Sequence, residues 1–136
     1  MGIRYEKDTI LNWINEMGKF LRLLTDKYEA FDEPADQNVL EVEAGYRTFF
    51  EKERSWMLGL SEKELLSYIE AELENEQIRP LAILFLRDAL LLPEGETQQK
   101  LLRNSQFLLE YVSQKLGSFS FEDYGNLTLI QERLQK

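Results

Sequence analysis

The sequence contains no cysteine and no histidine among its 136 residues. Without cysteine it can form no disulfide, no thiolate metal site, no iron–sulfur cluster and no cysteine nucleophile. Without histidine it lacks the commonest general base, the commonest transition-metal ligand and the usual side chain that titrates near neutral pH. Catalysis by this chain would therefore have to use carboxylates, lysine, tyrosine or serine.

Basic charge is also in short supply. The 16 Lys and Arg residues face 25 Asp and Glu residues, which gives a net charge of −9, and no basic arm interrupts the acidic excess. Such a surface repels phosphate backbones and anionic lipid, so we expect no nucleic-acid partner and no membrane partner. The first residues show no signal-peptide core, and Glu6 stands where a myristoylation motif has serine or threonine. We therefore expect a cytoplasmic protein.

The one long apolar run covers residues 81–92, where Arg87 and Asp88 are the sole interruptions. A helix that is apolar on all sides must be covered on several sides or lie in a membrane. Twelve residues span about 18 Å, which is too short for a bilayer core of about 30 Å. This stretch should therefore be the central helix of a helical domain.

Apolar residues spaced three and four apart predict further helices on both sides of the central one. We expect them over residues 9–30, 37–58, 62–76, 98–116 and 121–134. Residues 61–64 are typical of a capping box, with Ser61 at the N-cap and Glu64 three residues later, and Ser118 or Ser120 should cap the last helix. The sequence thus predicts an all-α fold of five to six helices in a single bundle-like domain over residues 1–136.

Two stretches carry a resemblance to known helical proteins. Residues 62–94 resemble a tetratricopeptide unit, because Ala82 and Ala89 are seven residues apart with Leu86 between them and a proline follows. The start, Tyr5-Glu-Lys-Asp-Thr-Ile, and the ending Phe-Ser-Phe121-Glu are similar to those of a family of small uncharacterised bacterial helical proteins. The resemblance implies an all-α fold with tetratricopeptide-like helical hairpins, and no site to carry over.

The first predicted helix carries an unusually wide apolar stripe. A heptad-like seam is flanked by Trp13, Phe20 and Leu23. One wall of a bundle is the explanation that we favour, but surplus apolar surface also marks interfaces. Because a symmetric dimer is the commonest closed assembly, we predict a homodimer with these three residues at the interface and the first helix near the two-fold axis.

The richest acidic cluster consists of Glu29, Asp32, Glu33 and Asp36. The i,i+3 spacing within each pair could point two carboxylates the same way, toward Mg²⁺ or Mn²⁺. Helical nucleotide pyrophosphohydrolases use paired Glu-x-x-Glu and Glu-x-x-Asp elements, but this chain contains no Glu-x-x-Glu and Pro34 interrupts the register. We favour a solvated helix end, and keep a carboxylate-dependent metal or nucleotide enzyme as the alternative.

The charged pair inside the central helix has three explanations. Adjacent residues on a helix do not face one another, so Arg87 and Asp88 are not each other's partner. They mark an exposed edge, which we favour, or Arg87 reaches a carboxylate on a neighbouring helix. The third explanation is an anion contact formed by Arg79, Arg87 and Arg103, since a buried arginine without a partner would cost too much. The function we predict is a protein–protein interaction or scaffold module without catalytic activity and without a cofactor.

Overall fold

The computed structural model describes residues 7–30, 35–118 and 120–135. Within them the chain forms seven helices and no strand, so the all-α prediction is confirmed, while the expected count of five to six is wrong. No helix in these ranges is long and apolar enough to cross a bilayer. The helices are α1 (Lys7–Ala30), α2 (Ala35–Phe50), α3 (Arg54–Leu58), α4 (Glu62–Glu72), α5 (Asn75–Leu90), α6 (Glu96–Lys115) and α7 (Phe121–Leu134).

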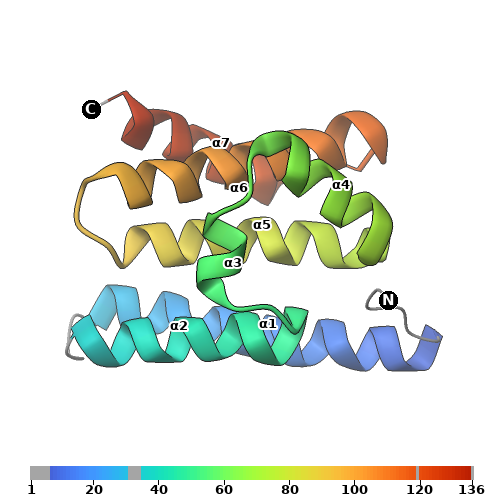
Figure 1. The fold of residues 1–136 in the computed structure, drawn as a ribbon, viewed down its shortest axis with the longest axis horizontal. Coiled ribbons are helices and arrows are strands. Elements are labelled where there is room, and N and C mark those ends of the chain that lie inside the picture. Colours follow the sequence, from blue (N-terminus) through green and yellow to red (C-terminus); the bar gives the residue numbers. More distant parts are fainter. Residues whose placement is uncertain (1–6, 31–34, 119, 136) are drawn as a thin grey trace.

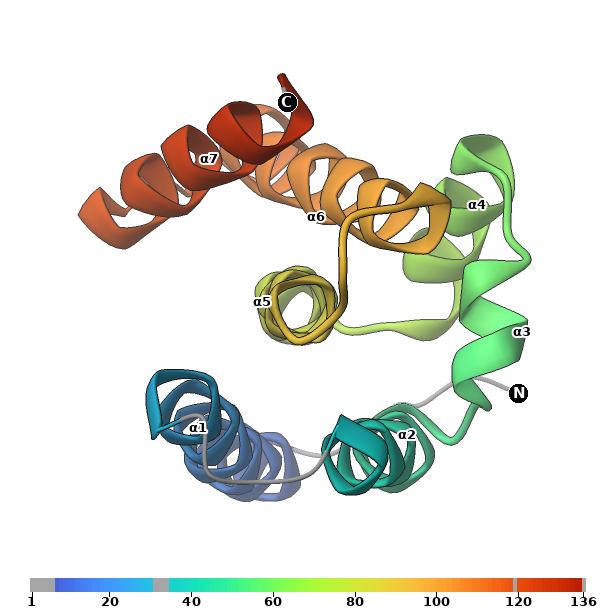
Figure 2. The ribbon, with the colours of Figure 1, turned by 90° about the vertical axis from the view of Figure 1, so that its left-hand side faces the viewer.

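The long helices lie in layers on either side of α5. In Figure 1, α1 and α2 run side by side along one edge, and α5, α6 and α7 lie above them. Figure 2 shows α5 almost end-on between the α1–α2 pair and α6. In this view α7 lies beside α6 at the upper left, and α3 and α4 lie along the right-hand edge. The most extensive helix contact joins α5 to α6, and the next joins α1 to α5.

The central helix is the one that the apolar run predicts. Eight apolar residues of α5 are buried and belong to a core cluster that reaches from Ile10 of α1 to Ile130 of α7. Two of the polar side chains of α6 that enter this core donate to α5: Ser105 donates to the carbonyl of Ala82 (2.7 Å), and Gln98 donates to the carbonyl of Ala89 (3.0 Å). Paired in this way, they do not carry the cost of buried polar groups without partners.

The ends of α5 differ from the prediction. The helix begins at Asn75 instead of residue 81, so Pro80 is its sixth residue and lies in the second turn. Proline has no N–H, and therefore the carbonyl of Glu76 has no donor at the i+4 position. The tetratricopeptide-like arrangement is not confirmed, because α4 and α5, the two helices of the predicted unit, make far less contact than α5 and α6.

The predicted helix over residues 37–58 is two helices. The chain leaves α2 after Phe50, and Glu51 adopts a φ of 58°, in the left-handed region that side chains with a Cβ rarely enter. Glu53 is extended at the N-cap of α3 (φ −72°, ψ 147°), and its exposed carboxylate accepts a hydrogen bond from Arg47 at 2.9 Å. This break turns α3 away from the axis of α2.

The capping box predicted at Ser61 and Glu64 is confirmed, and of the two serines predicted as a cap for the last helix, Ser120 is the N-cap. At α4, the Ser61 hydroxyl accepts from the Glu64 amide (3.1 Å), while the Glu64 carboxylate accepts from the Ser61 amide (2.9 Å) and has its pKa lowered by these hydrogen bonds. At α7, Ser120 and Asp123 repeat the same reciprocal pair, at 3.1 Å each way. Gly117, with a φ of 65°, follows the end of α6.

Candidate functional site

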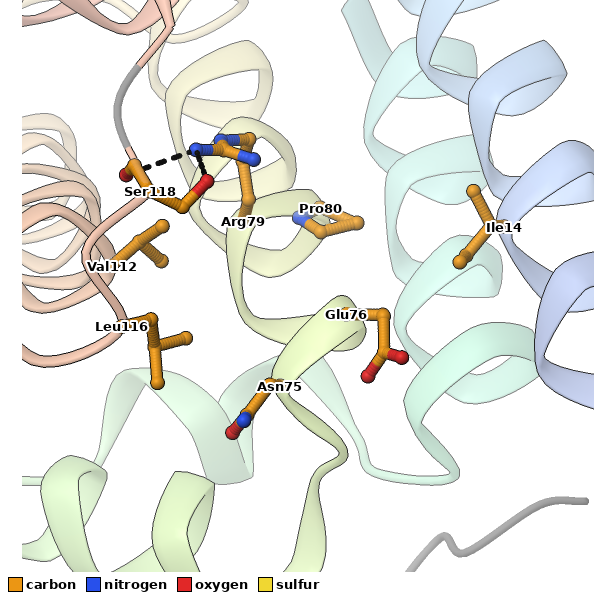
Figure 3. A pocket seen from close by; sticks show the side chains of 8 residues that line it. All are labelled: Ile14, Asn75, Glu76, Arg79, Pro80, Val112, Leu116 and Ser118. Atoms are coloured by element: carbon orange, nitrogen blue, oxygen red, sulfur yellow. Dashed lines mark hydrogen bonds between the residues drawn. The ribbon is translucent and has the colours of Figure 1, made fainter. Parts of the chain in front are cut away.

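A pocket of about 500 Å³ lies where α1, the first turns of α5 and the end of α6 meet. We call it the α1–α5–α6 groove. In Figure 3, Ile14 of α1 faces Pro80 of α5, and the α6 side chains lie beyond Arg79 on the other side. Its lining residues are Ile14, Asn75, Glu76, Arg79, Pro80, Val112, Leu116 and Ser118.

One wall of this groove is fixed by Arg79. Its Nε and Nη2 donate to the two carboxylate oxygens of Asp123 at 2.9 to 3.1 Å, and Nη2 also donates to the carbonyl and hydroxyl of Ser118 at 3.2 and 3.0 Å. The Asp123 side chain is 1 % exposed and also belongs to the capping box of α7. The pair therefore holds the first turn of α7 against α5, and these contacts leave Nη1 unused.

A second ion pair lies inside the core. Asp88 accepts from Arg54 in bidentate fashion (Nε to Oδ2 2.8 Å, Nη2 to Oδ1 2.9 Å) and from the Tyr46 hydroxyl (2.7 Å). The three residues come from α5, α3 and α2. Because Asp88 is 2 % exposed, the expectation that it marks an exposed edge of the central helix is wrong. A carboxylate inside an apolar helix is tolerated because all three donors point at it.

The electrostatics of this cluster follow from its burial. Burial raises the pKa of Tyr46 well above its ordinary value, and the charge of Asp88 and its hydrogen bond add to the shift. Partial burial by itself lowers the pKa of Arg54, but the hydrogen bonds and charge of Asp88 outweigh it and raise that pKa. The cluster thus keeps a phenol, a carboxylate and a guanidinium together in the interior.

A shallower pocket of about 420 Å³ lies between α3 and α4. We call it the α3–α4 groove, and its lining residues are Trp56, Leu60, Lys63, Glu64, Ser67, Tyr68, Ala71 and Glu72. The Lys52 ammonium lies 4.5 Å from the centroid of the Trp56 ring and 4.0 Å from a carboxylate oxygen of Glu72. Tyr68 packs its ring against Trp56 (centroids 5.3 Å apart) and its buried hydroxyl has no hydrogen-bond partner among the described residues. Burial raises the pKa of this phenol, and Glu72 and Glu51 raise it further.

The predicted interface residues of α1 do not share one surface. Trp13 is buried, and its indole N–H donates to the carbonyl of Phe49 at 2.9 Å. The Phe20 ring lies over Gly45, so close that a Cβ at position 45 would come within 2.3 Å of it. Leu23 is 57 % exposed. Two of the three side chains are therefore engaged within the chain, and the homodimer stays a prediction.

The three arginines of the predicted anion contact have different surroundings. Arg79 already has a carboxylate partner in Asp123. Arg87 is half-buried and lies eight residues further along α5, about 12 Å away at 1.5 Å per residue, while Arg103 is exposed on α6. An anion contact at these residues stays a prediction.

The predicted metal-binding acids fall at the junction of α1 and α2. Asp32 and Glu33 lie outside the described residues. Glu29 is in α1 and Asp36 is in α2, but their side chains are not among those described. Elsewhere in the described part of the chain, no group of three or more acidic side chains is placed to hold a metal ion. The metal site stays an untested alternative.

Sequence reasoning missed Tyr46, Arg54 and Asp123 as partners of buried charge. One signal was present: a carboxylate in the middle of an apolar run must find donors, and a tyrosine on the apolar stripe of a neighbouring helix is a natural one.

In comparisons with protein-family models, with curated proteins and with solved structures, nothing matches this chain.

Proposed function

We propose that this chain is a cytoplasmic protein-interaction module without catalytic activity, and that its α1–α5–α6 groove receives an apolar segment of a partner protein. The observation that carries the proposal is the groove itself. It is open and mainly apolar, and the Arg79–Asp123 pair fixes one of its walls. Concave sites with apolar walls and a few placed polar groups are the usual form of a binding site.

The polar groups of the groove suit a polypeptide. Nη1 of Arg79 is a donor that the contacts to Asp123 and Ser118 do not use, and the charge of the guanidinium is already balanced by Asp123. The carbonyl of Glu76 is an acceptor to which Pro80 cannot donate. This donor and this acceptor, beside half-buried Ile14 and Leu116, complement the amides and an apolar side chain of an extended segment.

We propose the absence of catalysis because the buried acidic side chains are paired with arginines. The buried carboxylates of the described residues are Asp88 and Asp123, and each is held by an arginine. The alternative, a carboxylate-dependent enzyme that uses Glu29 and Asp36, is tested by thermal melts with Mg²⁺, Mn²⁺ and Ca²⁺. A metal that binds only the native state at about 100 times its Kd adds about 2.7 kcal/mol to the free energy of unfolding. A rise in Tm that Glu29→Gln or Asp36→Asn removes would favour the enzyme.

The interaction is tested with selected peptides. Random peptides displayed on phage are selected on the immobilised chain, and the Kd of a synthesised winner is measured by calorimetry. The double variant Ile14→Ser/Leu116→Ser should weaken binding at least tenfold, because it removes apolar surface from both sides of the groove. The control is Phe121→Ser, which changes an exposed apolar residue of α7 outside the groove. Equal affinity for the wild type and the double variant would contradict the proposal.

A homodimer remains part of the proposal. Its support is apolar surface that the described chain leaves exposed on the α1–α2 side, at Leu11, Leu23 and Leu40. Sedimentation equilibrium at micromolar concentration decides the question. A mass near the single-chain value of 16.1 kDa would show that these leucines do not mediate self-association.

A further inference from the structure

The α3–α4 groove already holds a cation of its own chain. The ammonium of Lys52 lies over the Trp56 ring and beside the Glu72 carboxylate, at the edge of an open pocket. We propose that this groove binds a basic segment of a partner protein, with a lysine or arginine side chain taking the position between Trp56 and Glu72 that Lys52 fills in the free chain.

The first argument is the chemistry of that position. An aromatic face attracts a cation through the ring quadrupole, and a carboxylate on the same cation adds a charge contact. Trp56 is 40 % exposed, the highest value for an aromatic side chain among the described residues outside α7. The Lys52–Glu72 contact is long, at 4.0 Å, and both side chains are partly exposed, so a competing cation displaces it at little cost.

The second argument is an unpartnered polar group. Tyr68 lines the groove, the residue is 5 % exposed, and its hydroxyl has no hydrogen-bond partner among the described residues. A buried hydroxyl left without a partner is costly to the fold. A segment that enters the groove and brings amide and ammonium groups next to this phenol supplies a partner.

The third argument concerns shape and charge. Glu64, Ser67 and Ala71 of α4 follow one another at spacings of three and four, so the groove runs along one face of α4. Small side chains at 67 and 71 leave room for an extended segment instead of a single ion. The groove is lined by the acids Glu64 and Glu72 and by one base, Lys63. Displacement of Lys52 leaves the Glu72 carboxylate without its cation, and the whole chain carries a net charge of −9, so a basic segment is the complementary occupant.

The test uses a labelled, capped peptide in which two lysines flank a leucine, titrated with the full chain at physiological salt and followed by fluorescence anisotropy. We expect saturable binding of this peptide, and no binding of its counterpart with glutamates in place of the lysines. Trp56→Leu and Glu72→Gln should each weaken binding about fivefold. The matched control is Glu62→Gln, which removes the same charge from an exposed position of α4 outside the groove and should change the Kd by less than about twofold.

A second pair of variants tests the displacement directly. Lys52→Ala vacates the position over Trp56 and should strengthen binding about threefold. Lys19→Ala removes the same charge from an exposed position of α1 and should strengthen it less. Circular-dichroism melts confirm that each variant is folded.

Three results would overturn the proposal: equal binding by the wild type and Trp56→Leu, equal losses in Glu62→Gln and Glu72→Gln, or no saturable binding even by Lys52→Ala. The α1–α5–α6 groove is tested with other peptides and other variants. Failure of the basic-segment proposal is therefore distinguishable from failure of the proposed function.

Discussion

Replacing Asp88 by asparagine should destabilise this fold more than its small change in shape suggests. The carboxylate accepts two hydrogen bonds from Arg54 and one from Tyr46, all between 2.7 and 2.9 Å. An asparagine side chain at this position would retain one acceptor oxygen and would turn an N–H₂ group toward a donor. The guanidinium of Arg54, whose side chain is 14 % exposed, would lose its counter-charge.

The magnitude follows from breaking one side of a buried ion pair, which costs about 3–5 kcal/mol because the other charge stays desolvated. Asparagine keeps part of the hydrogen bonding, so we expect about 3 kcal/mol for Asp88→Asn. In a chain of 136 residues this corresponds to a fall in Tm of roughly 10 °C. Tyr46→Phe removes one hydrogen bond to a charged acceptor and should cost about 1–2 kcal/mol.

Urea unfolding followed by circular dichroism measures these free energies. The decisive comparison is a double-mutant cycle with Arg54→Met, which keeps a long side chain and removes the charge. Once Arg54 is gone, Asp88→Asn should cost far less, because neutralising an unpaired buried carboxylate is favourable, so the coupling energy should exceed about 2 kcal/mol. A coupling energy below about 0.5 kcal/mol, with unchanged m-values, would show that Arg54 and Asp88 do not act as a pair.

Single contacts elsewhere in the chain give four further predictions. Gly45→Ala should cost up to about 2 kcal/mol of unfolding free energy, because its Cβ meets the tip of the Phe20 ring while the higher helix propensity of alanine offsets about 1 kcal/mol, and Phe20→Leu in the same chain should recover the loss. Ala82→Asp should abolish the cooperative melt, because it buries an unpaired charge at a fully buried position of α5. Arg79→Met should raise the hydrogen-exchange rates of α7 before those of α5, because it removes the contacts to the first turn of α7. Burial raises the pKa of Tyr68, so the folded chain keeps a proton that the unfolded chain loses above about pH 10. The free energy of unfolding should therefore fall as the pH rises above about 10. Tyr68→Phe should reduce the slope of unfolding free energy against pH by up to about 1.4 kcal/mol per pH unit.

The features that could be predicted from the sequence are those set by neighbouring residues. The capping box at Ser61 and Glu64 involves residues three apart. The apolar run of α5 has no polar face to turn toward water, so this helix must lie at the centre of the fold. The early start of α5 could not be predicted in this way, because a proline before an apolar run is typical of a first turn. In the structure Pro80 lies in the second turn of α5 and lines the α1–α5–α6 groove.

The break at Glu51 could not be predicted, because its cause is distant in the sequence. Apolar residues stand at helical spacing on both sides of Glu53, at Phe49 and Phe50 before it and at Trp56 and Met57 after it, so within that window a continuous helix is the better solution. Arg54 and Tyr46 meet Asp88 across 34 and 42 residues, and the chain must turn between them for both side chains to reach the same carboxylate. A left-handed residue costs about 1–2 kcal/mol, less than an unpaired buried carboxylate, so the long-range contact decides the local conformation.

Each groove lies beside a buried aspartate that is paired with an arginine. The charged side chains that are buried in the described part of the chain are Asp88 and Asp123, and each is paired with an arginine from another helix. Arg54 holds α3, the helix that carries Trp56, against α5, whereas Arg79 ties the start of α7 to α5 beside Ser118. Apolar packing alone would tolerate α3 and α7 at several positions along α5, since burial has little directionality. A bidentate ion pair has one preferred geometry. We therefore infer that these two pairs fix the positions of α3 and α7 against α5, and that these positions determine where each groove opens.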